Sequence, residues 1–320
     1  MWKINLKKLK MHKPVLLKEV LSALNPKNGG VYVDATFGYG GYTEAILNSA
    51  NCKVIGIDRD LTALNRANEI KEKFFNRFDF FNSPFSLINQ VLNGLKVDGI
   101  VADLGVSSMQ VDNSERGFSF LKEAKLDMRM GLGAKCSAYE VINNYSEPEL
   151  REMIFKYGEE RLAKKIANFI VRERSLKPIT TTVELSNIIV QAYGSEAKYI
   201  KIHPATKTFQ AIRIFINNEL EEVETLLDKS TNLLNKDGIL AIVSFHSLED
   251  SIVKDFFVQN SPKKEKINKY AHFSKEARVD VSEIKPFILA SKGIIAPTME
   301  EVQENVRSRS ARLRFGIKTF

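Results

Sequence analysis

The sequence predicts an α/β fold with a seven-stranded, mostly parallel sheet and an inserted helical domain. In residues 15–103, short β-branched runs alternate with helical patterns, which is typical of parallel strands joined by right-handed crossovers. Strand-like runs are then missing from 109–206 and return at 239–245. We therefore expect residues 1–108 and 207–320 to form the two parts of a sheet domain, with a helical insertion over 109–206.

The expected elements follow from hydrophobic periodicity and from turn residues. A first helix covers 15–24 and ends before Pro26. The turn Asp237-Gly238 separates the fifth strand from a long amphipathic helix, and the segment 259–285 is polar enough to be a mobile loop. The main later helical patterns are 147–157, 159–174 and 208–234. The expected strands, the last two of them an antiparallel pair, are 31–35, 53–58, 78–81, 97–103, 239–245, 287–291 and 311–317.

Composition indicates a soluble globular protein. The chain has 320 residues, of which 44% are hydrophobic and 27% charged, and no apolar run is long enough to cross a membrane. The basic start, Met1 to Lys10, lacks the apolar segment of a signal peptide, and its role stays open. We expect a cytoplasmic protein. The two cysteines, Cys52 and Cys136, predict neither a disulfide framework nor a zinc site.

A net charge of +8 favours an anionic partner, above all a nucleic acid. An Arg-Ser run near the C-terminus supports this interpretation, because arginine and serine both bind phosphate oxygens. The segment 151–174 is also basic, and Glu160 with Lys164 has the spacing of a solvated helix. The residues of the Arg-Ser run are Arg307, Ser308, Arg309, Ser310, Arg312 and Arg314.

A glycine loop follows the first strand and predicts a site for an adenosine-containing ligand. Gly38, Gly40 and Gly41 allow close approach of the backbone, and Asp58 ends the second strand at about the 20-residue spacing of a ribose-binding acid. Two ligands compete, NAD(P) and S-adenosylmethionine. The loop departs from G-x-G-x-x-G, and Asp34 beside it suits the cations of S-adenosylmethionine. The pattern therefore favours a methyltransferase.

Polar residues also follow other strands of the expected sheet. Asp103 ends the fourth strand, and His246 follows the fifth. Open α/β sheets bind ligands outside the carboxyl ends of their strands, so these residues are expected to face one cleft with Asp34 and Asp58. Phe85, after the third strand, is placed either to stack on adenine or to fill the core.

Along its whole length the chain resembles the bacterial ribosomal RNA small-subunit methyltransferase H family, also called MraW. Many long motifs occur in the family's order, which makes the resemblance specific. The motifs are His12-Lys-Pro-Val-Leu-Leu-Lys-Glu-Val20, Asp34-Ala-Thr-Phe-Gly-Tyr-Gly-Gly41, Asp103-Leu-Gly-Val-Ser-Ser-Met-Gln110, Glu115-Arg-Gly-Phe-Ser-Phe120, Leu126-Asp-Met-Arg-Met130, Tyr157-Gly-Glu-Glu-Arg161, His203-Pro-Ala-Thr-Lys-Thr-Phe-Gln-Ala211, Ser244-Phe-His-Ser-Leu-Glu-Asp250 and Arg307-Ser-Arg-Ser-Ala311.

The resemblance implies a Rossmann-like class I methyltransferase that uses S-adenosylmethionine to methylate the exocyclic N4 of a cytosine in the decoding centre of 16S ribosomal RNA. Its partner would be this RNA, either free or within the small ribosomal subunit, and a homodimer stays open. Tyr42, Met109 and Val306 depart from the family, which usually has His, Pro and Pro there. The departure at Met109 weakens the assignment of the neighbouring Gln110 as a cofactor contact. The cofactor contacts that the resemblance implies are Gly40, Gly41, Tyr42, Asp58, Phe85, Asp103 and Gln110.

The chemistry points to His246 as the candidate catalytic residue. Cytosine N4 is a poor nucleophile because its lone pair is conjugated with the ring, so an enzyme must hold it in line with the methyl group. The Asp-Pro-Pro-aromatic type of motif of many amino-methyltransferases is missing after Asp103, which argues against a DNA amino-methyltransferase. The intact glycine loop argues against a non-catalytic ribosome-assembly factor. No metal is expected, since the donor carries its own activation.

Overall fold

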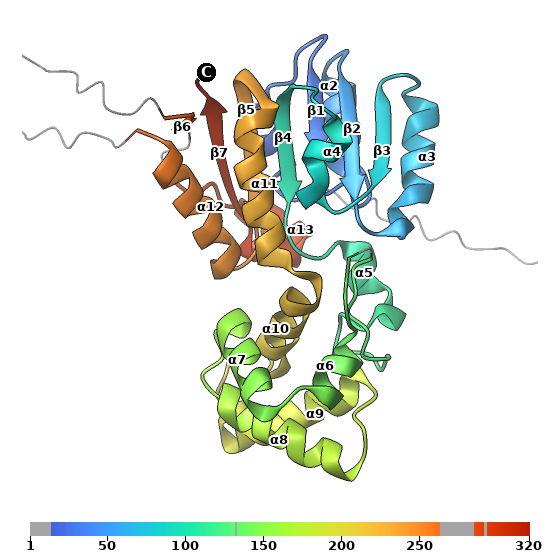
Figure 1. Cartoon of the computed structure of the whole chain (residues 1–320), viewed down its shortest axis with the longest axis vertical. Coiled ribbons are helices and arrows are strands. Elements are labelled where there is room, and N and C mark those ends of the chain that lie inside the picture. The colour runs from blue at the N-terminus through green and yellow to red at the C-terminus, as the bar shows by residue number, and fades with distance from the viewer. Residues whose placement is uncertain (1–13, 132, 263–284, 291–292) are drawn as a thin grey trace, which may run out of the picture.

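The computed structural model describes residues 14–131, 133–262, 285–290 and 293–320. Figure 1 shows two bodies, one built on a twisted sheet and one made of helices. The N-terminal extension 1–10 and most of the expected loop 259–285 lie outside the described residues. Within the described ranges, no helix is long and apolar enough to cross a membrane.

The sheet confirms the fold class predicted from the sequence. Among the described residues it has seven strands in the order β3-β2-β1-β4-β5-β7-β6. Strands β1 to β5 pair in parallel, whereas β7 runs antiparallel to both β5 and β6, as expected for the last pair. The strands are β1 Val31–Asp34, β2 Lys53–Asp58, β3 Phe78–Asn82, β4 Val97–Asp103, β5 Leu234–Ser244, β6 Phe287–Leu289 and β7 Arg312–Lys318.

Helices cover both faces of the sheet, because successive strand residues point to opposite faces. Tyr32 and Val101 belong to a core cluster with α1, α2 and α3 on one face. Val33 and Ile100 belong to a second cluster with α4, α11 and α12 on the other. The helices of the sheet body are α1 Leu17–Leu24, α2 Gly41–Ser49, α3 Leu64–Lys73, α4 Ile88–Leu92, α11 Glu219–Leu233, α12 Ser247–Asn260 and α13 Met299–Glu304.

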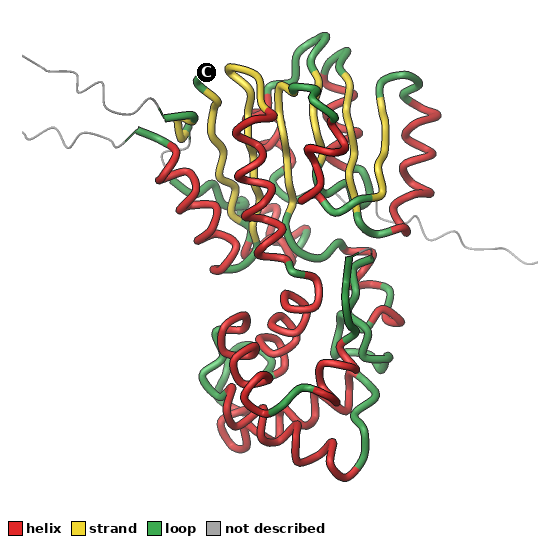
Figure 2. Tube along the Cα trace, viewed as in Figure 1, coloured by secondary structure: helices red, strands yellow, loops and turns green. Residues whose placement is uncertain are grey.

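The second body has a hydrophobic core of its own. Figure 2 shows helices and loops in this region and strands only in the sheet body. Its core includes Phe209, Ile212 and Ile216 of α10, beyond the boundary at residue 206 expected from the sequence. We therefore propose that the helical unit extends to the end of α10. Between β4 and α11 the helices are α5 Ser108–Asp112, α6 Ala138–Asn144, α7 Glu147–Gly158, α8 Ala163–Leu176, α9 Thr182–Tyr193 and α10 Ala205–Asn217.

The expected single helix over 208–234 is wrong. Asn218 adopts a left-handed conformation with φ 54° and separates α10 from α11. Asparagine tolerates this conformation better than most residues. Tertiary contacts fix the break: the side chain of Asn217 donates to the Met128 carbonyl at 2.8 Å and accepts from the Met130 amide at 2.8 Å.

Two further expectations need correction. Strand β5 begins at Leu234 rather than at 239, and Asp237 with φ 63° lies inside it, where the register against β4 shifts. Asp237-Gly238 is therefore an irregularity within a strand and not the turn before it. Glu160 is buried rather than solvated beside Lys164, because its carboxylate accepts a hydrogen bond from the Tyr193 hydroxyl at 2.6 Å.

Candidate cofactor and active site

The glycine loop between β1 and α2 requires its glycines for steric reasons. Gly40 has φ 72°, and a Cβ placed there would lie 2.4 Å from Cδ1 of Ile70. A Cβ at Gly41 would lie 2.2 Å from Cγ of Pro14. The loop is therefore held close to the α1 entry segment and to α3, which fixes its backbone at the carboxyl end of β1.

Asp58 lies at the tip of β2 and shapes this loop directly. Its Oδ2 accepts from the Gly38 amide at 2.7 Å, and its Oδ1 accepts from the Asp60 amide at 2.8 Å. Burial raises the pKa of this carboxyl to about 6, against the opposing effect of the two amides and of Arg59. Each carboxylate oxygen keeps a second lone pair, so Asp58 can still accept hydrogen bonds from ribose hydroxyls.

Asp34 has a structural task that the sequence interpretation did not assign. The side chain is fully buried, with 0% exposure. Its Oδ2 accepts from the hydroxyl and the amide of Thr43 at 2.7 and 3.2 Å. Burial raises the pKa of Asp34 to about 6. We expected this acid to face the cations of the ligand, whereas it holds the first turn of α2 against β1.

The other predicted cofactor residues divide into backbone and side-chain candidates. The ring of Tyr42 is buried, and its hydroxyl donates to the Val15 carbonyl, so only its backbone faces the loop. Gln110 is also buried, and its Nε2 donates to Oδ2 of Asp60 at 2.8 Å. Phe85 follows β3, with its side chain partly buried against the α4 and α11 core. Stacking of Phe85 on adenine stays a prediction.

The segment after β4 lies beside the glycine loop. A Cβ added at Gly38 would be 3.9 Å from the Cβ of Ser107. The side chains of Ser107 and Gln110 form a capping box at the start of α5, which orders this segment although Met109 replaces the family's usual proline. Gln110 thus connects the tip of β2, through Asp60, to the tip of β4.

Asp103 is the strongest candidate for a group that binds a ligand. Its amide donates to Oγ1 of Thr36 at 2.6 Å, which ties the end of β4 to the end of β1. Its Oδ1 is buried and has no hydrogen-bond partner among the described residues. Burial, followed by the charges of Asp34 and Glu249, raises the pKa of Asp103 well above its usual value. A bound cation or N–H donor would stabilise the charged carboxylate and lower this pKa.

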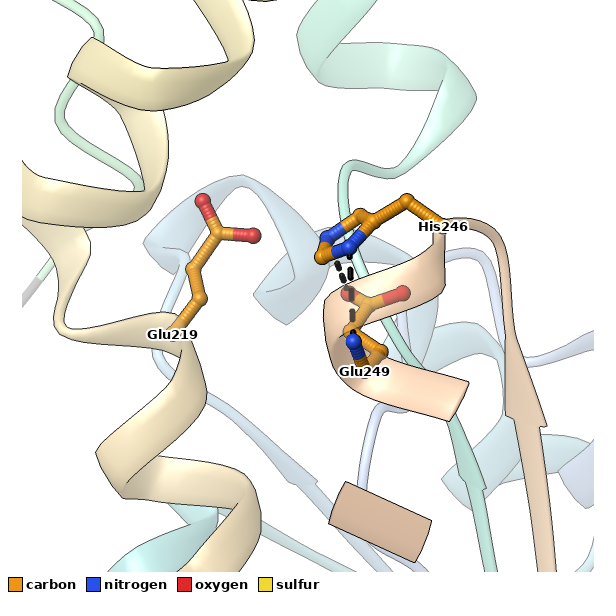
Figure 3. Close-up of side chains that lie close together, drawn as sticks. All are labelled: Glu219, His246 and Glu249. Carbon is orange, nitrogen blue, oxygen red and sulfur yellow. Dashed lines mark hydrogen bonds and ion pairs between the residues drawn. The ribbon is translucent and has the colours of Figure 1, made fainter. Parts of the chain in front are cut away.

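After β5, His246 is the N-cap residue of α12, and its side chain lies close to Glu219 and Glu249 (Figure 3). Its Nδ1 accepts from the Glu249 amide at 3.4 Å, and its Nε2 lies 3.1 Å from Oε1 of Glu249. Apart from this contact with each other, Nε2 of His246 and Oε1 of Glu249 have no hydrogen-bond partner among the described residues. Glu219, at the start of α11, directs its carboxylate toward the same space.

Arg213 balances the charge of these acids. Its Nε and Nη2 donate to the two oxygens of Glu219 at 2.8 and 2.9 Å, a bidentate buried pair. Burial alone would raise the pKa of Glu249, but His246, the Phe245 amide and Arg213 together hold it below its usual value. A Cβ added at Gly105 would lie 3.9 Å from Oε1 of Glu249, so the segment after β4 passes over this cluster.

Glu219, His246 and Glu249 could together hold a metal ion, since one ligand atom from each lies within 4.8 Å of the others. The guanidinium of Arg213 already occupies both oxygens of Glu219. A divalent cation there would face this fixed positive charge, which disfavours binding.

Several residues of this site were missed by the sequence interpretation. Glu249 lies inside a motif that we singled out, yet only its burial of 99% and its contact with His246 reveal a role. Arg213 and Glu219 belong to different helices, and no spacing rule connects them across the break. Asp60, the partner of Gln110, lies two residues beyond a strand tip where a solvated turn is the simpler expectation.

Three of the four arginines in the Arg-Ser run are paired with acids rather than free for phosphate. Arg314 is buried, with its Nε 2.7 Å from Oδ1 of Asp250. Arg312 donates to Oδ2 of the same carboxylate at 2.8 Å. Arg307 lies 2.6 Å from Oδ1 of Asp112. The expectation of a phosphate-binding run therefore needs correction for Arg314, whose role is to fix β7 against α12.

The family model described as the MraW methylase family matches residues 9–319. Among curated proteins, ribosomal RNA small subunit methyltransferase H of Orientia tsutsugamushi (strain Ikeda) is 48% identical over 312 residues, covering 96% of this chain and 98% of the relative. The protein of the same name from Rickettsia canadensis (strain McKiel) is 49% identical over 303 residues, covering 95% and 96%.

A solved structure of an rRNA methylase from Streptococcus thermophilus is also similar, with 10% sequence identity and a TM-score of 0.43, covering 97% of this chain and 99% of that one. The relatives at nearly half identity and the model match over almost the whole chain agree with the order of motifs found in the sequence. The resemblance is thereby confirmed: the chain belongs to the MraW methylase family.

Proposed function

We propose that this protein uses S-adenosylmethionine to methylate the exocyclic N4 of a cytosine in the decoding centre of 16S ribosomal RNA. One observation carries the proposal: at the end of β4 and the start of α12, Asp103 Oδ1 is buried without a hydrogen-bond partner among the described residues, and His246 Nε2 and Glu249 Oε1 face only each other at 3.1 Å. Buried polar atoms normally have partners, so a bound group is expected to supply them. An exocyclic amine offers two N–H donors to the two carboxylates.

The residues around the glycine loop fit S-adenosylmethionine, which supplies a methyl group on a positively charged sulfur. Asp58 would accept from ribose hydroxyls while it holds Gly38, and the backbone of Gly40, Gly41 and Tyr42 would line the ligand. Asp103, whose pKa is raised by burial, would be stabilised in its charged form near that cation. We keep Phe85 and Gln110 as proposed contacts, the first by stacking and the second from the α5 segment.

The hydrogen bonds of His246 define its proposed role. Because Nδ1 accepts from the Glu249 amide, the network assigns the imidazole proton to Nε2. Nε2 then acts as a donor that faces Oε1 of Glu249 at 3.1 Å, and a bound cytosine would offer it the ring N3 or O2 as an alternative acceptor. His246 would therefore orient the base, and the carboxylates of Asp103 and Glu249 would accept the N4 protons. Drawing these protons away raises electron density on nitrogen and provides an acceptor for the one that is lost.

The RNA substrate is supported by the names of the relatives, which call them ribosomal RNA small subunit methyltransferases. The net charge of +8 agrees with an anionic substrate. On the helical unit, exposed Lys164 and Lys165 lie with Arg161 around a hollow of about 660 Å³ at the start of α8. We propose that this unit helps hold RNA, in which case RNA affinity should fall as salt rises.

Nucleoside analysis tests the proposal. Small ribosomal subunits from a strain that lacks this gene would be incubated with the enzyme and S-adenosylmethionine, and the RNA digested and examined by mass spectrometry. We expect N4-methylcytidine. An Asp103→Asn enzyme should lose most of this product, whereas Asp79→Asn, a control at an exposed carboxylate, should keep it. Methylation at a ring carbon, at a ribose oxygen or at adenine N6 would contradict the assignment of N4.

A further inference from the structure

A second cavity borders His246. It has a volume of about 570 Å³, and its lining includes Phe245, His246, Ser247, Ile294, Arg309 and Arg312. This size is within the usual range for small-ligand sites. Apolar side chains form one part of the wall and arginines another. The apolar part suits the base or ribose of a nucleotide, and the arginines suit its phosphate.

Arg309 differs from the other arginines of the Arg-Ser run. Arg307 is paired with Asp112, and Arg312 and Arg314 share Asp250. Arg309 is exposed and has no carboxylate partner in the part of the chain that the structure describes. Its charge is therefore not neutralised within the fold, and its guanidinium is free to bind an anion that enters the cavity.

The position of the cavity ties it to the active site. His246 borders the cavity and also contacts Glu249 in the active-site cluster. Ser247, also in its lining, donates to Glu159 of the helical unit, so the cavity lies where the two bodies meet. An RNA strand whose target base reaches the β4 and β5 tips would place a neighbouring nucleotide in this cavity.

We infer that this cavity binds the nucleotide next to the target cytosine in the RNA strand, with Arg309 on its phosphate. The inference rests on the proposed function. Arg312 contributes less, because it already donates to Oδ2 of Asp250 at 2.8 Å. In this arrangement Arg309 acts on substrate affinity and register, and it does not take part in the transfer of the methyl group.

The test compares Arg309→Gln with Lys71→Gln, which removes an equal charge from an exposed pair on α3. Methylation of small subunits from a strain that lacks the gene gives kcat and KM, and calorimetry gives the Kd for S-adenosylmethionine. For Arg309→Gln we expect KM to rise about tenfold, the effect of losing one charge-assisted hydrogen bond, with unchanged kcat and cofactor Kd. The log–log salt slope of RNA binding should weaken by about 0.7. Lys71→Gln should match the wild type.

A second variant tests the cavity without changing charge. Ala296→Trp, on the cavity wall, should also raise KM while thermal stability stays at the wild-type value. A wild-type KM and salt slope in Arg309→Gln, or a wild-type KM in Ala296→Trp, would overturn the inference. So would a changed cofactor Kd, which would assign Arg309 to S-adenosylmethionine. If the wild-type enzyme methylates no cytosine N4, the proposed function fails instead, and the two failures are thus distinguishable.

Discussion

Binding of S-adenosylmethionine should depend on pH through Asp58. The pKa of this carboxyl is raised from 3.8 to about 6, mainly by burial. Ribose hydroxyls donate to the charged form, so the ligand lowers this pKa when it binds. Below pH 6 the free enzyme must lose a proton before it binds well. If the bound carboxyl returns to a pKa of about 4, Kd at pH 5 should be about tenfold higher than at pH 7.5.

The Asp58→Asn variant isolates this effect. An amide can accept from only one of the Gly38 and Asp60 amides, because its NH2 group faces the other donor. Leaving that donor unsatisfied costs about 1–3 kcal/mol, part of which should appear as weaker cofactor binding. The same variant has no carboxyl at position 58 to titrate, so the part of the pH dependence that Asp58 causes should disappear between pH 5 and 7.5.

Isothermal titration calorimetry at several pH values measures both quantities, with circular dichroism to check the fold. Asp79→Asn serves as the control, since that carboxylate is exposed and paired only with Lys71 at 3.1 Å. It should keep the pH dependence of the wild type. If Asp58→Asn kept that dependence as well, the titrating group would be another one, with Asp103 the first candidate because burial raises its pKa well above the usual value and the bound cation would lie near it. A wild-type Kd that is flat with pH would refute the reasoning outright.

The remaining predictions concern single positions of the site. His246→Asn should preserve stability, because asparagine is a good helix N-cap, yet lower the single-turnover methylation rate at least tenfold; a wild-type rate would remove His246 from the mechanism. Arg213→Leu should lower the free energy of unfolding by about 3–5 kcal/mol, since Glu219 stays buried and unpaired; urea denaturation measures this, and a loss below 1 kcal/mol would contradict it. Gly40→Ala should destabilise the fold by more than 1 kcal/mol in the same assay, because its Cβ would overlap Ile70, and unchanged stability would contradict the steric argument.

The sheet could be predicted because its signals are local. β-Branched runs that end in Asp34, Asp58 and Asp103 indicate both the strands and the edge at which a ligand binds. The break at Asn218 has no local signal of this kind, because it depends on how Asn217 meets Met128 and Met130 from a distant segment. Helical periodicity continues through it, and tertiary contacts override the pattern.

The candidate site shows the same division. Spacing after the glycine loop identified Asp58, whose contact with Gly38 agrees with that position. Spacing does not show which acid is buried. The sequence therefore suggests that Asp34 faces the ligand, whereas its carboxylate accepts a hydrogen bond from the Thr43 hydroxyl. The position of Glu219 near His246 was also not predictable, because Glu219 and its partner Arg213 come from helices whose relative placement depends on the break between them.

The most direct measurement of the central claim is a map of N4-methylcytidine in 16S ribosomal RNA from cells with and without this gene. Cells without the gene would be complemented either with the wild-type gene or with the Asp103→Asn variant. We predict one decoding-centre cytosine that carries the N4-methyl group with the wild-type gene and lacks it in the deletion and in the Asp103→Asn strain. An identical map in all strains would contradict the proposed reaction, and restoration by Asp103→Asn would contradict the assigned site.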